Sequence, residues 1–531
     1  MTAVRRSDPG GRRRRLLVAQ GAFLVMTVTA AAAPATLQEA TDGTRAKGLR
    51  AGPHAVGFEV IAREDRTRRI NQTDAGTRIG LAVWYPARRT SEGPPAMTAM
   101  DYRLTQFRDP PTAAQRTALE DDEVGALVAW RHVGIVPLTD EQARSSLATR
   151  GVAVKSAPPA AGRFPVVLLF GGPYYLSTTA EILASHGFLV VAPFRFSDQS
   201  NEVGTRGFTW SLENNVRDAE WGLEELRADP RADVGYVSAL GHGGGGLQAM
   251  LFAMRNPTVN AVVNIDAGNF STRSQPRSIP FYNPRLMRAP YLFIVTADTR
   301  KGLDLFDDFA AMKFSDRTEV TLESPSLRHH DLSDIGRAVT APMGIRGEAQ
   351  AEVQSQYAGV QEMVVRFLED RSGARKNGAV PFAEWVRTMS LPAHISVTVR
   401  PGTTPAPTAA ALVRSLDAGS VASLKAARSR DPEADVFTES ALSGLIAQAL
   451  ASDDLKTAAA LGDLAIDMHP ASAILLAQAS RVAEAGGNRS GAIAAATTCA
   501  QLHAENDWRA TAAIGQCRDR LERLGRTPVP R

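Results

Sequence analysis

Between about residues 57 and 370, short runs of β-branched and aliphatic residues alternate with longer stretches whose apolar residues recur at helical spacing. This alternation is typical of a mostly parallel sheet with helices on both faces. The runs at 57–61 and 78–85 predict two antiparallel strands. Buried central strands are predicted at 165–170, 187–192, 234–240, 259–265 and 291–295, and helices at 178–186, 213–227, 246–254, 303–314 and 348–370. The pattern therefore predicts one α/β domain over 57–370.

Two segments depart from this alternation. The stretch 98–162 is too long for a tight connection and contains a helical pattern at 112–132, so it is either a cap over a site or a plain surface insertion. After about residue 400 the chain is alanine-rich and helical, and Pro401-Gly-Thr-Thr-Pro-Ala-Pro407 is typical of a linker. We therefore expect a linker over 371–407 and a small all-α domain over 408–525.

A period of 34 residues runs through the helical domain, because Ala458, Ala465 and His469 fall in register with Ala492, Cys499 and His503. This spacing resembles the tetratricopeptide repeat. The resemblance implies a module that binds a protein partner. The alternative is an appendage that packs on the larger domain, since fewer than three repeats build little concave surface.

The first 35 residues have the pattern of an export signal. An arginine-rich start, with Arg12–Arg15 as its last part, precedes an apolar stretch at 16–33 and the cleavage motif Ala33-Pro-Ala35. The protein is therefore expected to be periplasmic or secreted, and the alternative is a membrane anchor formed by an uncleaved 16–33. Without residues 1–35, which hold six arginines and one aspartate, the formal net charge falls from +4 to −1. Because the remaining chain is almost neutral, its charge gives no indication of a nucleic-acid partner.

The cysteines and histidines predict no metal site. Cys499 and Cys517 are the two cysteines, and an exported chain could leave them free or join them in a disulfide. The nine histidines include no H-x-x-x-H pair. We therefore expect neither a metal ion nor a cofactor.

A glycine-rich run, Ala239-Leu-Gly-His-Gly-Gly-Gly-Gly246, joins a predicted strand to a predicted helix. Strand, sharp turn and helix form the setting of the hydrolase motif G-x-S-x-G, in which the central serine attacks the substrate. In this chain the central position is Gly243. The motif thus predicts a hydrolase turn that lacks its nucleophile.

Three further passages resemble the α/β-hydrolase superfamily, particularly platelet-activating-factor acetylhydrolases and dienelactone-hydrolase-like esterases. They are Leu81-Ala-Val-Trp-Tyr-Pro86, Leu183-Ala-Ser-His-Gly-Phe188 and His329-His-Asp-Leu-Ser-Asp334. The last is similar to the family's H-x-x-F-x-D around the catalytic histidine. The resemblance implies an α/β-hydrolase fold and a protein related to carboxylic-ester hydrolases.

The resemblance also implies a role for each site residue, because this fold places nucleophile, acid and histidine in that chain order. The base is assigned to His329, with His330 as second choice. The acid is Asp266 or, as an alternative, Asp298; both follow predicted strands. The oxyanion donors are the backbone NH groups of two glycines, Gly172 and Gly244.

Three functions follow from these assignments. A glycine cannot attack a carbonyl, so the first is a degenerate or very weak hydrolase that binds an acyl or ester-like ligand or a protein partner. The second is an active hydrolase that uses His329-activated water or a relocated nucleophile, for which Ser177 and Ser238 are the nearby hydroxyls. Tyr174, Tyr175 and Trp210 predict an apolar-walled cleft.

The third function comes from a different class of protein. Gly241-x-Gly243-x-x-Gly246 also satisfies the G-x-G-x-x-G pattern of dinucleotide-binding folds, and Asp266 then falls where a ribose would be held. Against this alternative, the motif follows several earlier strands instead of opening the sheet.

Overall fold

The structure is a computed structural model. It describes residues 44–70, 75–90, 93–129, 138–197, 208–267, 279, 281–302, 306–334, 336, 349–373, 380–388, 394–504 and 507–525. The predicted export signal lies outside these ranges. Within them, no helix is both long and apolar enough to cross a membrane.

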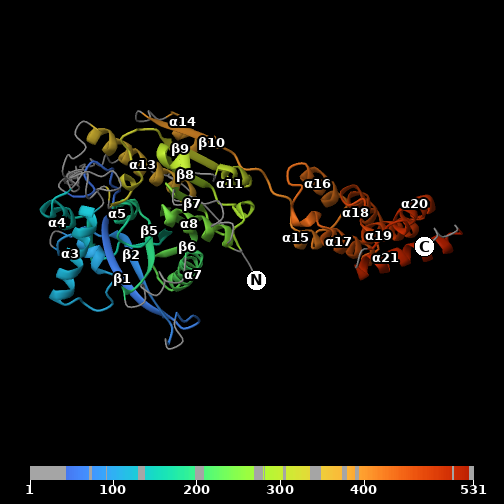
Figure 1. The fold of residues 1–531 in the computed structure, drawn as a ribbon, viewed down its shortest axis with the longest axis horizontal. Helices are drawn as coiled ribbons and strands as arrows, with labels where there is room; N and C mark the ends of the chain where they lie inside the picture. Colours follow the sequence, from blue (N-terminus) through green and yellow to red (C-terminus); the bar gives the residue numbers. More distant parts are fainter. Residues whose placement is uncertain are drawn as a thin grey trace, which may run out of the picture.

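Ten strands form a single sheet in the order β10-β9-β8-β7-β6-β4-β5-β2-β1-β3 (Figure 1). The strands are β1 (Ala55–Asp65), β2 (Thr77–Ala87), β3 (Ala153–Lys155), β4 (Phe164–Phe170), β5 (Leu189–Arg195), β6 (Ala232–His242), β7 (Ala261–Ile265), β8 (Tyr291–Thr296), β9 (Arg317–Leu322) and β10 (Ile395–Arg400). Strands β4 to β9 pair in parallel, whereas β2 is antiparallel to both β1 and β5. The predicted parallel sheet with an antiparallel start is therefore confirmed.

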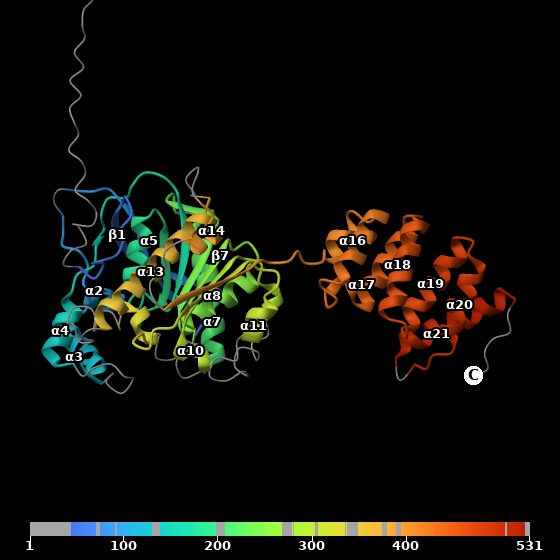
Figure 2. The same ribbon diagram turned by 90° about the horizontal axis from the view of Figure 1, so that it is seen from above.

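Helices cover both faces of this sheet. One face carries α5 (Ser177–Ser185), α13 (Ala349–Arg371) and α14 (Phe382–Thr388). The other carries α7 (Phe208–Leu226), α8 (Gly244–Arg255) and α11 (Phe306–Ala311), and α10 (Ala297–Gly302) follows β8 (Figure 2). Alternate residues of β4 enter opposite cores, with Val167 and Leu169 on the α5 side and Val166 and Leu168 on the α8 side. Burial on both faces explains why the central strands are continuous apolar runs.

The segment 98–162 is integrated into the sheet domain at one end. It contains α2 (Ala99–Leu104), α3 (Ala113–Ala129) and α4 (Asp140–Ala148) before β3, which pairs with β1 at the edge of the sheet. Tyr102 of α2 is buried, accepts a hydrogen bond from Trp84 Nε1 at 3.0 Å and donates one to Glu181 Oε1 at 2.7 Å. These contacts fix α2 against the core.

The expected linker over 371–407 contains structure that the sequence analysis did not predict. Helix α14 packs Phe382 on Phe367 of α13, with ring centroids 5.1 Å apart, and β10 pairs antiparallel with β9. The sheet therefore extends to Arg400, and the extended connection begins after it. The prediction failed here because β10 is an edge strand in which polar residues alternate with valines and only Ile395 is buried.

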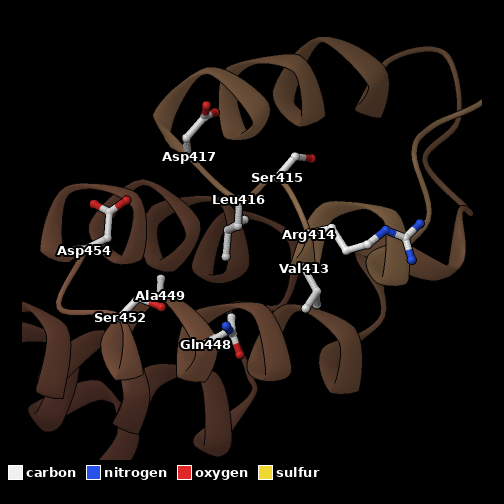
Figure 3. A pocket seen from close by; sticks show the side chains of 9 residues that line it. All are labelled: Val413, Arg414, Ser415, Leu416, Asp417, Gln448, Ala449, Ser452 and Asp454. Carbon is white, nitrogen blue, oxygen red and sulfur yellow. The ribbon is translucent and has the colours of Figure 1, made fainter.

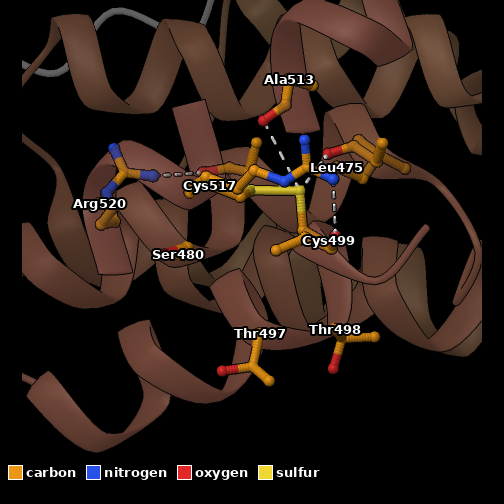
Figure 4. Close-up of a disulfide and its surroundings, with 12 residues drawn as sticks. Leu475, Ser480, Thr497, Thr498, Cys499, Ala513, Cys517 and Arg520 are labelled. Carbon is orange, nitrogen blue, oxygen red and sulfur yellow. Dashed lines mark hydrogen bonds between the residues drawn. A yellow bond between two sulfur atoms is a disulfide. The ribbon is translucent and has the colours of Figure 1, made fainter. Parts of the chain in front are cut away.

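The C-terminal region is a succession of helices with two apolar clusters of its own. The helices are α15 (Ala409–Val413), α16 (Ala418–Arg428), α17 (Glu439–Ala451), α18 (Leu455–Met468), α19 (Ala473–Ala485), α20 (Arg489–Ala500) and α21 (Trp508–Arg523). Cys499 of α20 and Cys517 of α21, both fully buried, form a disulfide (Figure 4). The predicted combination of an α/β-hydrolase fold with an all-α region is confirmed.

A cavity of about 320 Å³ opens between α15, α16 and α17 (Figure 3). Its two carboxylates cap helices: Asp417 accepts from Ser420 N at 2.7 Å, and Asp454 accepts from Thr457 N at 3.0 Å. These acidic groups therefore serve the helix N-termini.

Candidate functional site

The turn at Gly243 has the backbone geometry of a nucleophile turn. Strand β6 ends at His242, Gly243 adopts φ 55° and ψ −124°, and α8 begins at the next residue. The NH of Gly243 donates to the carbonyl of Ile265 at 2.8 Å, and its own carbonyl accepts from Gly246 N at 3.0 Å. Hydrolases of this fold carry the attacking residue on such a sharp strand-to-helix turn, where a side chain is strained.

The glycines that flank Gly243 are required by close packing. A Cβ on Gly241 would lie 2.2 Å from the carbonyl carbon of Gly245, and one on Gly245 would lie 2.4 Å from the carbonyl oxygen of Phe170. A Cβ on Gly246 would lie 2.3 Å from Asn264 Oδ1. The glycine pattern therefore lets α8 approach β4, β6 and β7 closely, and this packing explains it without a dinucleotide.

His329 and Asp266 form a hydrogen-bonded pair. His329 Nδ1 donates to Asp266 Oδ2 at 2.9 Å, although the two residues are 63 positions apart. Asp266 has no exposed surface and also accepts from Thr296 N at 2.8 Å and from Thr299 Oγ1 at 3.0 Å. Burial opposes ionisation of Asp266, but the hydrogen bond and charge of His329 hold the pKa of this carboxyl below its ordinary value. Because its oxygens are engaged in this way, Asp266 is poorly placed to hold a ribose.

The imidazole of His329 faces the turn. A Cβ built on Gly243 would lie 3.2 Å from both Nε2 and Cε1 of His329. Because Nδ1 donates to Asp266, a neutral His329 presents an unprotonated Nε2 on the side of Gly243. The structure thus brings together three residues that the sequence assigns to one site: Gly243, Asp266 and His329.

Two neighbouring histidines surround His329. His242 stacks on it with ring centroids 4.3 Å apart and donates from Nε2 to its carbonyl oxygen at 3.0 Å. Burial and repulsion from His329 lower the pKa of His242 to about 3 and that of His330 to about 4. Both rings are therefore neutral near pH 7. Sequence reasoning missed His242, although it occupies the variable position just before Gly243 in the motif.

The alternative residues are placed differently. Asp298 is exposed and pairs with Arg328 at 3.1 Å, and Asp266 instead contacts the histidine. Ser238 is buried within β6 between β4 and β7. Ser177 donates to Asp334 Oδ2 at 2.6 Å. Neither serine lies at the turn beside His329.

The proposed oxyanion donors lie on neighbouring turns. Gly172 follows β4 and adopts φ 82°, and Gly244 is the first residue of α8, where the NH has no partner within the helix. A Cβ on Gly245 would lie 3.2 Å from Gly171 N, so the two turns are in contact. Beyond Gly172, Tyr174 is buried and Tyr175 is 44% exposed.

No metal ligand set accompanies this site: within the described ranges, no three His, Cys, Asp or Glu side chains are grouped to hold an ion. Among the aromatic residues predicted to line the cleft, Trp210 lies on α7. The guanidinium of Arg195 lies over its ring, 5.8 Å from the centroid.

Comparison with known proteins adds a hydrolase relative. No family model matches the chain. Chlorophyllase-1 of Arabidopsis thaliana is 26% identical over 178 residues, which are 31% of this chain and 52% of the relative, so the chain spans about half the length of that protein. A ferulic acid esterase from Streptomyces cinnamoneus aligns with 98% of its own chain and 66% of this one, at 17% identity and a TM-score of 0.46. The sheet order and the chlorophyllase match give the coarse result, a chain of α/β-hydrolase fold similar to a known hydrolase.

Proposed function

We propose that the α/β domain is a degenerate hydrolase, which binds a carboxylic-ester or acyl ligand in a retained cleft and has lost the nucleophile of covalent catalysis. One observation carries the proposal. His329 Nε2 lies 3.2 Å from the position of a Cβ on Gly243, while His329 Nδ1 is held by Asp266. The base and its acid are therefore arranged around a turn that carries no attacking atom.

The remaining parts of the site have a binding role in this proposal. The NH groups of Gly172 and Gly244 would donate hydrogen bonds to the carbonyl oxygen of the ligand, and His329 can donate to or accept from a polar group next to it. The ester class follows from the resemblance of the four sequence passages to esterases. The name of the curated relative adds chlorophyll as a ligand to test in the same cleft.

A second candidate function is slow hydrolysis by water, supported by the position beside His329 that a side chain at Gly243 would fill. His329 Nε2 would take a proton from water there, the hydroxyl would attack the ester carbonyl, and the proton would pass from His329 to the leaving alkoxide. Sites that lack one member of a catalytic triad retain rates on the order of 10³–10⁴ over water. Wild-type activity at that level, lost in His329→Ala, would support this route.

The test of the main proposal is ester hydrolysis by four purified proteins. We expect Gly243→Ser to hydrolyse p-nitrophenyl butyrate on the order of 10³-fold faster than wild type, since it supplies the missing nucleophile. Adding His329→Ala should abolish the gain. Gly244→Ser is the matched control, because a Cβ there has no neighbour within 4 Å and does not meet His329. Equal rates in both serine variants would overturn the proposal.

Export is proposed for the whole protein, with support from the arginine-rich, apolar and A-x-A segments at 1–35 and from the disulfide between Cys499 and Cys517. Disulfides persist mainly in oxidising compartments. Expression with a bacterial export pathway should yield a soluble chain whose mass corresponds to cleavage after Ala35. A full-length chain held in the membrane fraction would instead support the anchor formed by 16–33.

For the helical region, we propose packing on the α/β domain as well as a tetratricopeptide-like partner site. Asp431, which is buried, pairs with Arg285 and lies 3.6 Å from Lys313 Nζ. Glu433 Oε2 lies 2.6 Å from Arg285 Nη1. These ion pairs join the two regions and favour the packing role.

A further inference from the structure

A buried polar cluster connects the loop of His329 (residues 329–334) to the segment that begins with the turn at Gly172 (residues 171–178). Asp334 lies five residues after His329 and is 2% exposed. Its backbone NH donates to the carbonyl of Tyr175 at 2.8 Å. Its carboxylate Oδ2 accepts from Ser177 Oγ at 2.6 Å and from Thr178 N at 2.8 Å. A single residue thus bonds the loop of His329 to the segment that directly follows Gly172.

An arginine from the N-terminal segment completes this cluster. Arg45 Nη1 donates to Ser177 Oγ at 2.7 Å and lies 3.5 Å from Asp334 Oδ2, while Nη2 lies 3.6 Å from Glu181 Oε1. All three charged side chains are at most 3% exposed. Burial raises the pKa of Glu181 in spite of the attraction of Arg45, whose positive charge also faces Asp334.

Stability alone is a poor explanation for such a cluster. Taking ions out of water costs several kcal/mol per ion, and apolar replacements of buried ion pairs are often as stable. The cluster does fix the relative position of two segments that are far apart in the sequence: the loop that carries His329 and the segment that follows Gly172. The distance from His329 to the NH of Gly172 depends on that relative position, and small errors in such distances have large effects on chemistry.

We propose that Asp334, paired with Arg45, is a positioning residue that holds the loop of His329 against the turn at Gly172. This inference deepens the proposed function and rests on it for the meaning of the site. The cluster itself can be tested without any hydrolysis, because it predicts which backbone segments loosen together when the carboxylate is lost.

The first measurement is hydrogen exchange by mass spectrometry on the full chain. We expect Asp334→Asn to raise exchange by at least about threefold in peptides covering both 171–178 and 329–334, with the rest of the sheet unchanged. Ser177→Ala, a milder change, should loosen the same two segments to a smaller extent. The matched control is Asp218→Asn, since Asp218 is also buried and pairs with Arg195 at 2.8 Å. It should loosen peptides of α7 and β5 instead.

The second measurement uses the Gly243→Ser background. There Asp334→Asn should lower kcat about 10- to 100-fold with little change in KM, because base and oxyanion donors lose their register. In the same background, Arg45→Lys should retain more activity than Arg45→Met, because lysine keeps the positive charge beside Asp334. If Gly243→Ser is inactive, the proposed function fails while the exchange data still decide the role of Asp334. If Asp334→Asn leaves both segments protected, or loosens the whole domain equally, the positioning role is wrong.

Discussion

The two sides of the candidate site differ in what their residues contribute. On one side, Asp266 is fully buried and accepts hydrogen bonds from His329, Thr296 and Thr299. On the other, Gly243 offers no side chain, although its turn keeps the strained backbone shape. The difference teaches that the backbone shape of the turn and the identity of its central residue have separate causes. Packing of α8 on β4 maintains the turn whatever residue occupies it, whereas a nucleophile is kept only by selection for chemistry.

The largest effect is expected when the acid is removed from a site to which the nucleophile has been restored. In the Gly243→Ser background, Asp266→Asn should reduce kcat on the order of 10³-fold. Thr296 N would hold the amide oxygen in the place of Oδ1, so the amide NH2 would face His329 Nδ1, donate to it and favour the wrong tautomer of the imidazole. The measurement is kcat and KM for a p-nitrophenyl ester. A loss below about threefold would mean that the His329–Asp266 pair does not serve catalysis.

The histidine side should make stability depend on pH. His242 and His330 have pKa values lowered to about 3 and about 4 in the folded protein, whereas unfolded histidine titrates near 6.5. Between these values the unfolded chain binds more protons, so the free energy of unfolding should fall as the pH decreases from about 6.5 to about 4. The lowered pKa of Asp266 adds a further loss as the pH falls through the ordinary carboxyl range, near 3.9.

These pKa values predict a decrease of about 3 kcal/mol from His242 between pH 7 and pH 4, and a smaller decrease from His330, whose ring is only half-buried and is screened by solvent. The measurement is the free energy of urea unfolding at each pH. His242→Gln, which keeps an NH donor for the His329 carbonyl, should flatten the slope. An unchanged slope in that variant would show that His242 is not the group responsible.

On the turn side, Gly243→Ser should lower stability while it raises activity. The turn adopts φ 55°, and the new Cβ meets His329 at 3.2 Å, so the histidine must shift by a few tenths of an ångström. We expect a loss of about 1–3 kcal/mol in the free energy of unfolding, with a matching decrease in Tm. A more stable serine variant would contradict the strained geometry of the turn.

The smallest effect is expected at the residue that the structure places outside the site. Asp298→Asn should change stability by less than about 0.5 kcal/mol and leave the activity of Gly243→Ser within about twofold, because its ion pairs are exposed. Kinetics and thermal unfolding of that variant, beside Asp266→Asn, compare the two candidate acids directly. A large loss of activity in Asp298→Asn would reverse their order.

The sequence predicts the central strands well because they are buried on both faces and are therefore continuously apolar. Strand β9 was missed for the opposite reason. Its residues are Arg317-Thr-Glu-Val-Thr-Leu322, and the polar ones are buried with partners, such as Glu319 with Arg300 at 3.4 Å. A pattern of polar residues does not reveal that ion pairs allow them inside the sheet.

Within the site, the motif locates Gly243 and His329 but leaves the acid open, because Asp266 and Asp298 both follow parallel strands. Only the path of the loop that carries His329 determines which one it contacts. The partners Arg45 and Asp334 are 289 residues apart and carry no local signal. Such long-range pairs are invisible to periodicity and motif spacing.

The most direct test of the central claim is covalent labelling at residue 243. A fluorophosphonate that reacts with activated serines is added to wild type, Gly243→Ser, Gly244→Ser and Gly243→Ser with His329→Ala, and each intact mass is measured. We predict one adduct on Gly243→Ser alone, mapped by peptide sequencing to residue 243. Labelling of wild type would reveal another nucleophile, and a Gly243→Ser protein that stays unlabelled while folded would show that His329 and Asp266 do not form a working base beside this turn.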